Sequence, residues 1–167
     1  MKTTKLKALG ACANARAFAR RKKSYQEGWE KNKRVDWALW LLCHASNAHY
    51  LMAIGLVIEF TERALHLRPG CDSHESIEAA RAYSRDPSVA NREACSVVSV
   101  QFPSICVADA CLRDDPHFGF GIEFTVDAMY TIATRAARIL GEGEERHWQM
   151  ARILEVCPVC PISEEGK

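Results

Sequence analysis

The sequence W-E-K-N-K-R-V-D-W-A-L-W-L-L-C-H at residues 29–44 holds three of the four tryptophans of this chain. Trp37, Trp40 and His44 follow the three- and four-residue spacing that puts side chains on one face of a helix. A helix that is apolar on most of its sides is usually buried. The stretch therefore predicts a core helix with Asp36 as its N-cap. The alternative is a tryptophan-lined recognition groove, because Trp beside Arg is also typical of binding sites.

Helical patterns continue on both sides of this stretch. Residues 3–22 form a basic helical pattern in which Ala13 and Ala17 would pack inward. Ser24 and Glu27 have the spacing of a capping box, which predicts the start of a short helix. Further helices are expected over 48–67, from Asp72 to a stop at Asp86-Pro87, and over 88–111 with an interruption at Pro103. Two more are expected over 121–140, ended by Gly141, and over 143–156.

Composition and periodicity together indicate one helical domain. The chain has 167 residues, of which 48% are hydrophobic, enough for a single core. We predict an all-α fold, a single-domain antiparallel array of roughly seven to nine helices. It would span residues 1–160, with 161–167 as a flexible C-terminal tail. The longest apolar run, Tyr50–Ile58, is too short to cross a membrane, and no secretory signal is evident. We therefore expect a cytoplasmic protein without a membrane partner.

The charge of the chain is distributed unevenly. Residues 1–34 contain 11 Lys and Arg and 2 acids, a net charge of +9, whereas the remaining residues have a net charge of −8. Five of the basic residues form what we call the basic cluster: Arg16, Arg20, Arg21, Lys22 and Lys23. These side chains could pair with acids of the same fold, or they could face outward and attract an anionic partner.

Two pairs of residues have spacing suited to zinc. Cys71 and His74 form one pair, and Cys157 and Cys160 form the other. Thiolates and imidazoles two residues apart can point at one tetrahedral centre, but the fold would have to bring these distant pairs together. We expect no cofactor, with zinc at these four residues as the alternative. A metal-dependent enzyme is the third class of function considered, but no catalytic motif is present and we expect a protein without enzyme activity.

Several segments of the chain together resemble a known family. They are A-C-A-N-A-R-A-F-A at 11–19, S-Y-Q-E-G-W-E-K-N-K-R-V-D-W-A-L-W-L-L at 24–42, R-P at 68–69, S-I-E-A-A-R-A-Y-S at 76–84 and E-R-H-W-Q at 145–149. This arrangement resembles the alanine-rich helical immunity proteins of bacterial polymorphic toxin systems, which have phage-encoded relatives. The resemblance implies an all-helical, antitoxin-like protein that binds and neutralises a protein partner.

We therefore expect an interaction protein in the cytoplasm of a bacterial cell. Its partner would be a toxin or a host defence factor, blocked by an immunity protein or a phage-encoded inhibitor. The expected partner-binding residues are Arg16, Arg20, Arg21, Lys22, Lys23, Trp29 and Arg34. The alternative is a protein that binds nucleic acid or an anionic nucleotide through its basic N-terminal helix.

Overall fold

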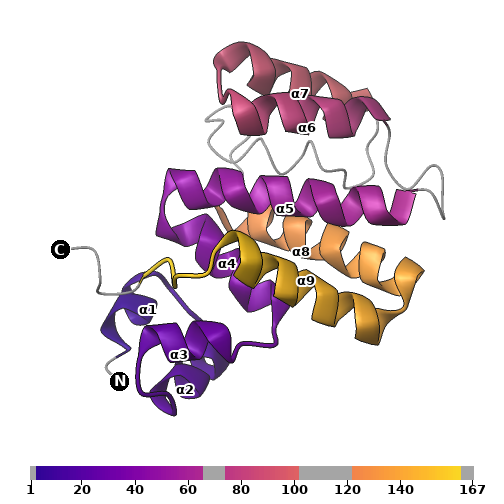
Figure 1. Cartoon of the computed structure of the whole chain (residues 1–167). Helices are drawn as coiled ribbons and strands as arrows, with labels where there is room; N and C mark the ends of the chain where they lie inside the picture. Colours follow the sequence, from indigo (N-terminus) through magenta and orange to yellow (C-terminus); the bar gives the residue numbers. More distant parts are fainter. Residues whose placement is uncertain (1–2, 66–73, 102–121, 163–167) are drawn as a thin grey trace.

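The computed structural model describes residues 3–65, 74–101 and 122–162, and within these ranges the chain forms nine α-helices and no strand (Figure 1). They are α1 Thr4–Ala8, α2 Ala13–Arg20, α3 Tyr25–Glu30, α4 Val35–Ala45, α5 Asn47–Leu65, α6 His74–Arg85, α7 Val89–Gln101, α8 Ile122–Leu140 and α9 Glu142–Val156. The predicted all-α array of seven to nine helices is confirmed.

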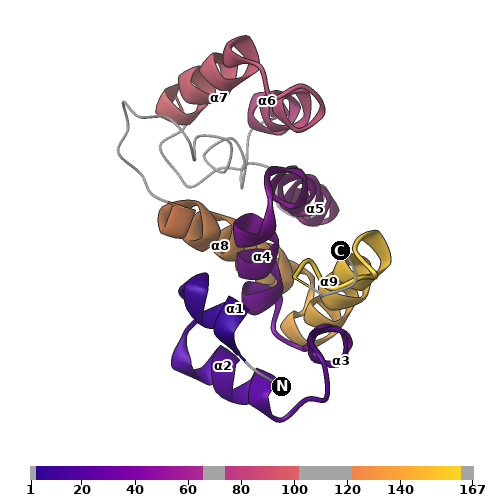
Figure 2. The same ribbon diagram turned by 90° about the vertical axis from the view of Figure 1, so that its left-hand side faces the viewer.

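Four helices, α4, α5, α8 and α9, enclose the core of the molecule. Helix α5 lies at its centre and contacts α4, α6, α8 and α9, which explains why it is apolar on several sides. The side chains without any exposed surface include Leu39, Leu42, Tyr50, Ile54, Phe60, Met129 and Ile153. Figures 1 and 2 show α1–α3 on one side of this core and α6–α7 on the opposite side, beyond α5.

Helix α4 enters the core with its leucine face, not with its tryptophan face. Leu39 and Leu42 are fully buried, whereas Trp37 and Trp40 are half-buried. Because α4 is covered on two sides, its two apolar faces meet different neighbours, and the tryptophans turn toward the residues of α1–α3. The expectation that Asp36 caps the helix is wrong: Arg34 holds the N-cap position, and Asp36 lies in the first turn.

The N-terminal residues form two helices where the sequence pattern predicted one. The chain turns at Gly10, whose φ of +83° lies in the left-handed region that favours glycine. This turn resets the helical register, so Ala13 and Ala17 are exposed and do not pack inward as predicted. Other residues of α2, namely Ala15, Phe18 and Ala19, line a pocket instead.

Helix α3 begins with the predicted serine cap. The Ser24 hydroxyl accepts a hydrogen bond from the Glu27 amide at 3.0 Å, while the Glu27 carboxylate accepts one from the Lys23 amide, one residue earlier than in a capping box. A side-chain hydrogen bond from Lys31 and the backbone bond from Lys23 lower the pKa of Glu27. These contacts fix the start of the helix that carries Trp29.

Helices α6 and α7 form a hairpin that packs on α5. Helix α6 ends at Arg85, directly before the predicted stop at Asp86-Pro87. The predicted start at Asp72 and the predicted interruption at Pro103 lie outside the described residues. Among the helices that are described, none combines the length and the apolar character needed to cross a bilayer.

Candidate functional site

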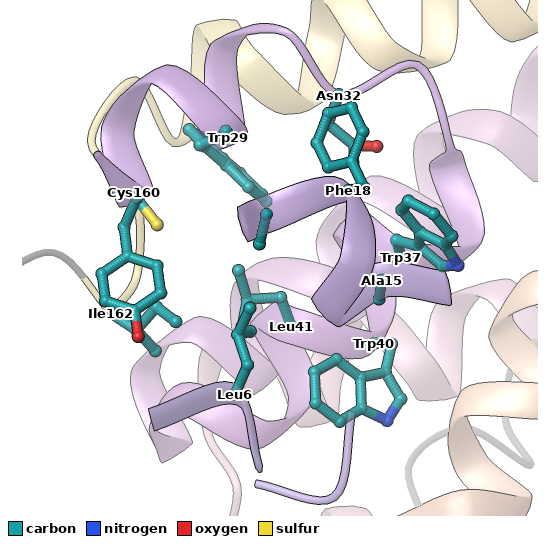
Figure 3. A pocket seen from close by; sticks show the side chains of 13 residues that line it. Leu6, Ala15, Phe18, Trp29, Asn32, Trp37, Trp40, Leu41, Cys160 and Ile162 are labelled. Atoms are coloured by element: carbon teal, nitrogen blue, oxygen red, sulfur yellow. The ribbon is translucent and has the colours of Figure 1, made fainter. Parts of the chain in front are cut away.

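A pocket opens between α1, α2, α3, α4 and the chain that follows α9. Its walls include five aromatic side chains: Phe18, Tyr25, Trp29, Trp37 and Trp40. The space between atoms is about 510 Å³, including the solvent at the mouth. In Figure 3, Trp29, Cys160 and Ile162 form one side of this tryptophan pocket, and Trp37 and Trp40 lie on the other.

Residues 157–162 close the pocket on the side of α3. The indole N–H of Trp29, a side chain only 3% exposed, donates to the carbonyl of Cys157 at 2.7 Å. The Gln26 amide donates to the Pro158 carbonyl at 2.8 Å and its oxygen accepts from the Cys160 amide at 2.7 Å. Three polar contacts therefore hold this segment against α3.

The contacts of this segment continue to residue 162, two residues beyond the predicted end of the domain at 160. Ile162 lines the tryptophan pocket, and its carbonyl accepts a hydrogen bond from the Lys5 ammonium at 3.2 Å. The sequence pattern offered no signal for this contact, because it joins residues 157 positions apart.

Cationic side chains contact the pocket walls. The Lys22 ammonium lies 4.6 Å from the centre of the Phe18 ring, and the Arg34 guanidinium lies 4.8 Å from the centre of the Trp37 ring. A cation over an aromatic face is attracted by the ring quadrupole. Lys5 adds a third positive charge through its bond to Ile162. The apolar pocket therefore has a positively charged rim.

The basic cluster lies on α2 and the turn that follows it, beside this rim. Arg20, Arg21 and Lys23 are exposed, and Arg16 and Lys22 are half-buried. Across the part of the chain that the structure describes, no ion pair joins any of these five side chains to a carboxylate. The cluster is thus directed outward in that part of the fold.

The acids of the described body pair with arginines of the body itself. Three such ion pairs join different helices: Arg152 with Glu59 at 2.7 Å, Arg63 with Glu145 at 3.2 Å, and Arg81 with Glu62. These carboxylates are therefore paired with arginines of neighbouring helices in the body. Mutual neutralisation would require ion pairs between the basic cluster and acids of the body, and none is present among the described residues.

Two of the expected partner-binding residues are engaged within the fold. Trp29 is buried and reaches only the inside of the tryptophan pocket. Arg34 forms two hydrogen bonds with the Asp36 carboxylate, which raise the pKa of Arg34 and hold its guanidinium over Trp37. Trp29 therefore forms part of the pocket wall, while Arg34 belongs to the rim.

Of the four residues considered for zinc, the three that the structure describes do not lie together. Cys71 lies outside the described residues, and His74 is exposed at the start of α6, which packs on α5 and α7. Cys157 and Cys160 are both buried beside α3. Where residues are described, no three His, Cys, Asp or Glu side chains gather as metal ligands would. Burial also raises the pKa of the Cys157 thiol and disfavours the thiolate that zinc requires.

The tryptophan pocket is suited to holding an apolar group. The Asn32 side chain, which lines it, already donates to the Arg34 carbonyl and accepts from the Arg34 amide, both at 3.0 Å. The pocket thus combines aromatic walls with few free polar atoms, and charge lies only at its rim. Comparisons of the chain with protein-family models, with curated proteins and with solved structures found no match.

Replacing Trp29 by Phe should loosen segment 157–162. The substitution removes the donor to the Cys157 carbonyl and leaves a buried acceptor unpaired, so we expect a loss of about 1–3 kcal/mol in the free energy of unfolding. The measurement is thermal melting together with the rate of thiol modification. Cys157 should react faster in the variant, while Cys12, which is exposed, should react equally fast in both proteins. Unchanged Cys157 reactivity would show that the indole bond does not hold the segment.

Proposed function

We propose that this chain is a cytoplasmic, non-enzymatic interaction protein that binds and neutralises an acidic protein partner, such as a toxin or a host defence factor. The binding surface is the basic cluster together with the tryptophan pocket. The observation that supports this most strongly is the outward direction of the cluster, whose side chains have no carboxylate partner among the described residues. The resemblance to immunity proteins agrees with such a role and stays a prediction.

The chemistry of the surface favours a protein over nucleic acid. Single-stranded nucleic acids are bound by basic grooves in which aromatic side chains stand exposed for base stacking. Here Trp29 is buried, and the rings of Trp37 and Phe18 are already covered by Arg34 and Lys22. Protein interfaces, in contrast, combine an apolar central anchor with a charged rim.

The direct test is a charge reversal with a matched control. Arg20→Glu with Arg21→Glu reverses two exposed charges of the cluster, and Arg85→Glu with Arg138→Glu reverses two exposed charges on α6 and α8. The chain is immobilised, the bacterial protein that it retains is identified, and its Kd is measured for all three proteins. We expect the cluster variant to bind at least about tenfold more weakly and to lose most of the salt dependence.

The melting temperatures should not differ by more than a few degrees, since exposed charges contribute little to stability. Equal Kd values for the cluster variant and the control would contradict the proposal. Retention of nucleic acid in place of a protein would favour the alternative function.

A further inference from the structure

We infer that the tryptophan pocket receives one large apolar side chain, phenylalanine or leucine, from an acidic segment of the partner. This inference rests on the proposed function and names the chemistry of the partner at the same site. The sequence of the partner should then contain a single apolar anchor residue with Asp or Glu on both sides.

The size and polarity of the pocket indicate an apolar side chain as the guest. The cavity itself measures about 70 Å³ within a larger space of about 510 Å³ that includes open solvent, which is room for one side chain. The five aromatic rings of the walls offer such a guest their edges and those faces that Lys22 and Arg34 leave uncovered. Because Asn32 donates to and accepts from the Arg34 backbone, and the Trp29 N–H donates to Cys157, these polar groups are already engaged within the fold. A polar guest would lose its bonds to water without replacement.

The charge of the rim indicates acidic residues next to the anchor. Lys22 lies over the Phe18 ring and Lys5 contacts Ile162 at the opposite side, whereas the charge of Arg34 is already paired with Asp36. An anchor that enters the pocket must carry its flanking residues past these cations. Flanking Asp or Glu would gain from them, and flanking Lys or Arg would be repelled. The wall that faces α3 is also held by hydrogen bonds from Trp29 and Gln26, so the pocket is preformed.

The helix α2 offers a matched pair of positions for the test. Ala15 lines the pocket, whereas Ala17 is exposed on the same helix. Ala15→Phe places a phenyl ring of this protein inside the pocket, and Ala17→Phe adds the same ring outside it. Should Ala15→Phe fail to fold, Ala15→Met fills part of the space with a more flexible side chain.

The probe is the heptapeptide acetyl-Glu-Asp-Glu-Phe-Glu-Asp-Glu-amide, with binding followed through tryptophan fluorescence. We expect the parent chain and Ala17→Phe to bind it equally, and Ala15→Phe to bind at least about tenfold more weakly. The same loss is expected for a peptide with alanine in place of phenylalanine. A peptide with Gln and Asn flanks should also bind more weakly, and its affinity should depend less on salt.

Three outcomes would overturn this inference, and they differ in what they leave of the proposed function. Equal binding of the phenylalanine and alanine peptides, with strong salt dependence, would overturn the pocket assignment and leave the acidic partner in place. A short single-stranded DNA that displaces the peptide at lower concentration than any acidic peptide would overturn both. Failure of the parent chain to bind the phenylalanine peptide would overturn the inference as well.

Discussion

Phe60→Ala is expected to lower the free energy of unfolding by about 3–5 kcal/mol, the cost of truncating a fully buried aromatic side chain. Phe60 has no exposed surface and packs edge-to-face on Trp148, with ring centres 5.7 Å apart. It lies on α5, the helix that α4, α6, α8 and α9 all contact, so the cavity would open at the centre of the core. Denaturant unfolding measures the loss.

Two further substitutions calibrate this expectation. Phe60→Leu keeps most of the volume and should cost much less than the alanine variant. Val89→Ala changes a side chain that is 69% exposed on α7 and should alter stability by no more than about 0.5 kcal/mol. A Phe60→Ala protein that unfolds like the parent would mean that α5 does not form the centre of the fold.

Arg63→Met is expected to destabilise the protein by about 2–3 kcal/mol, because it leaves a buried carboxylate without its partner. Glu145 is 2% exposed, and its only ion pair in the described structure is with Arg63, at 3.2 Å. The other oxygen of Glu145 has no hydrogen-bond partner among the described residues. Methionine retains the apolar stem of Arg63, while the variant also loses the contact of the guanidinium with the Trp148 ring, 3.8 Å from its centre.

The double substitution Arg63→Met with Glu145→Leu provides the control. Removing both partners removes the desolvated charge, so its stability should return to within about 1 kcal/mol of the parent. Since the side chain of Arg63 is 45% exposed, part of the pair is screened by solvent, and the expected single-variant loss is below that of a fully buried pair. If the single and double variants are equally destabilised, the effect comes from packing and not from the unpaired carboxylate.

The long helices could be predicted from the sequence because their boundaries carry strong signals. Gly141 separates α8 from α9, and Asp86-Pro87 follows the end of α6, as expected. The turn at Gly10 was missed, since one glycine within a Lys-, Ala- and Leu-rich pattern is often tolerated inside a helix. That single turn changed which alanines face inward.

The site was predicted only in part, because it depends on contacts between distant residues. The alternative of a tryptophan-lined groove named two of the lining side chains, Trp37 and Trp40, but most of the lining residues lie outside the stretch 29–44. Phe18 is presented by α2 only after the turn at Gly10, and Ile162 is brought in by hydrogen bonds to α3 and Lys5. Periodicity within one helix cannot reveal such pairings, whereas the charge asymmetry did indicate the basic cluster.

Amide hydrogen exchange of the chain with and without its bound partner tests most directly where binding occurs. The account predicts slower exchange in the complex over α2, over the following turn through Tyr25 and over residues 157–162. Helices α6 and α7, on the far side of α5, should exchange at the same rate in both states. Protection confined to α6 and α7, with no change in α2, would contradict the central claim that the basic cluster and the tryptophan pocket form the binding surface.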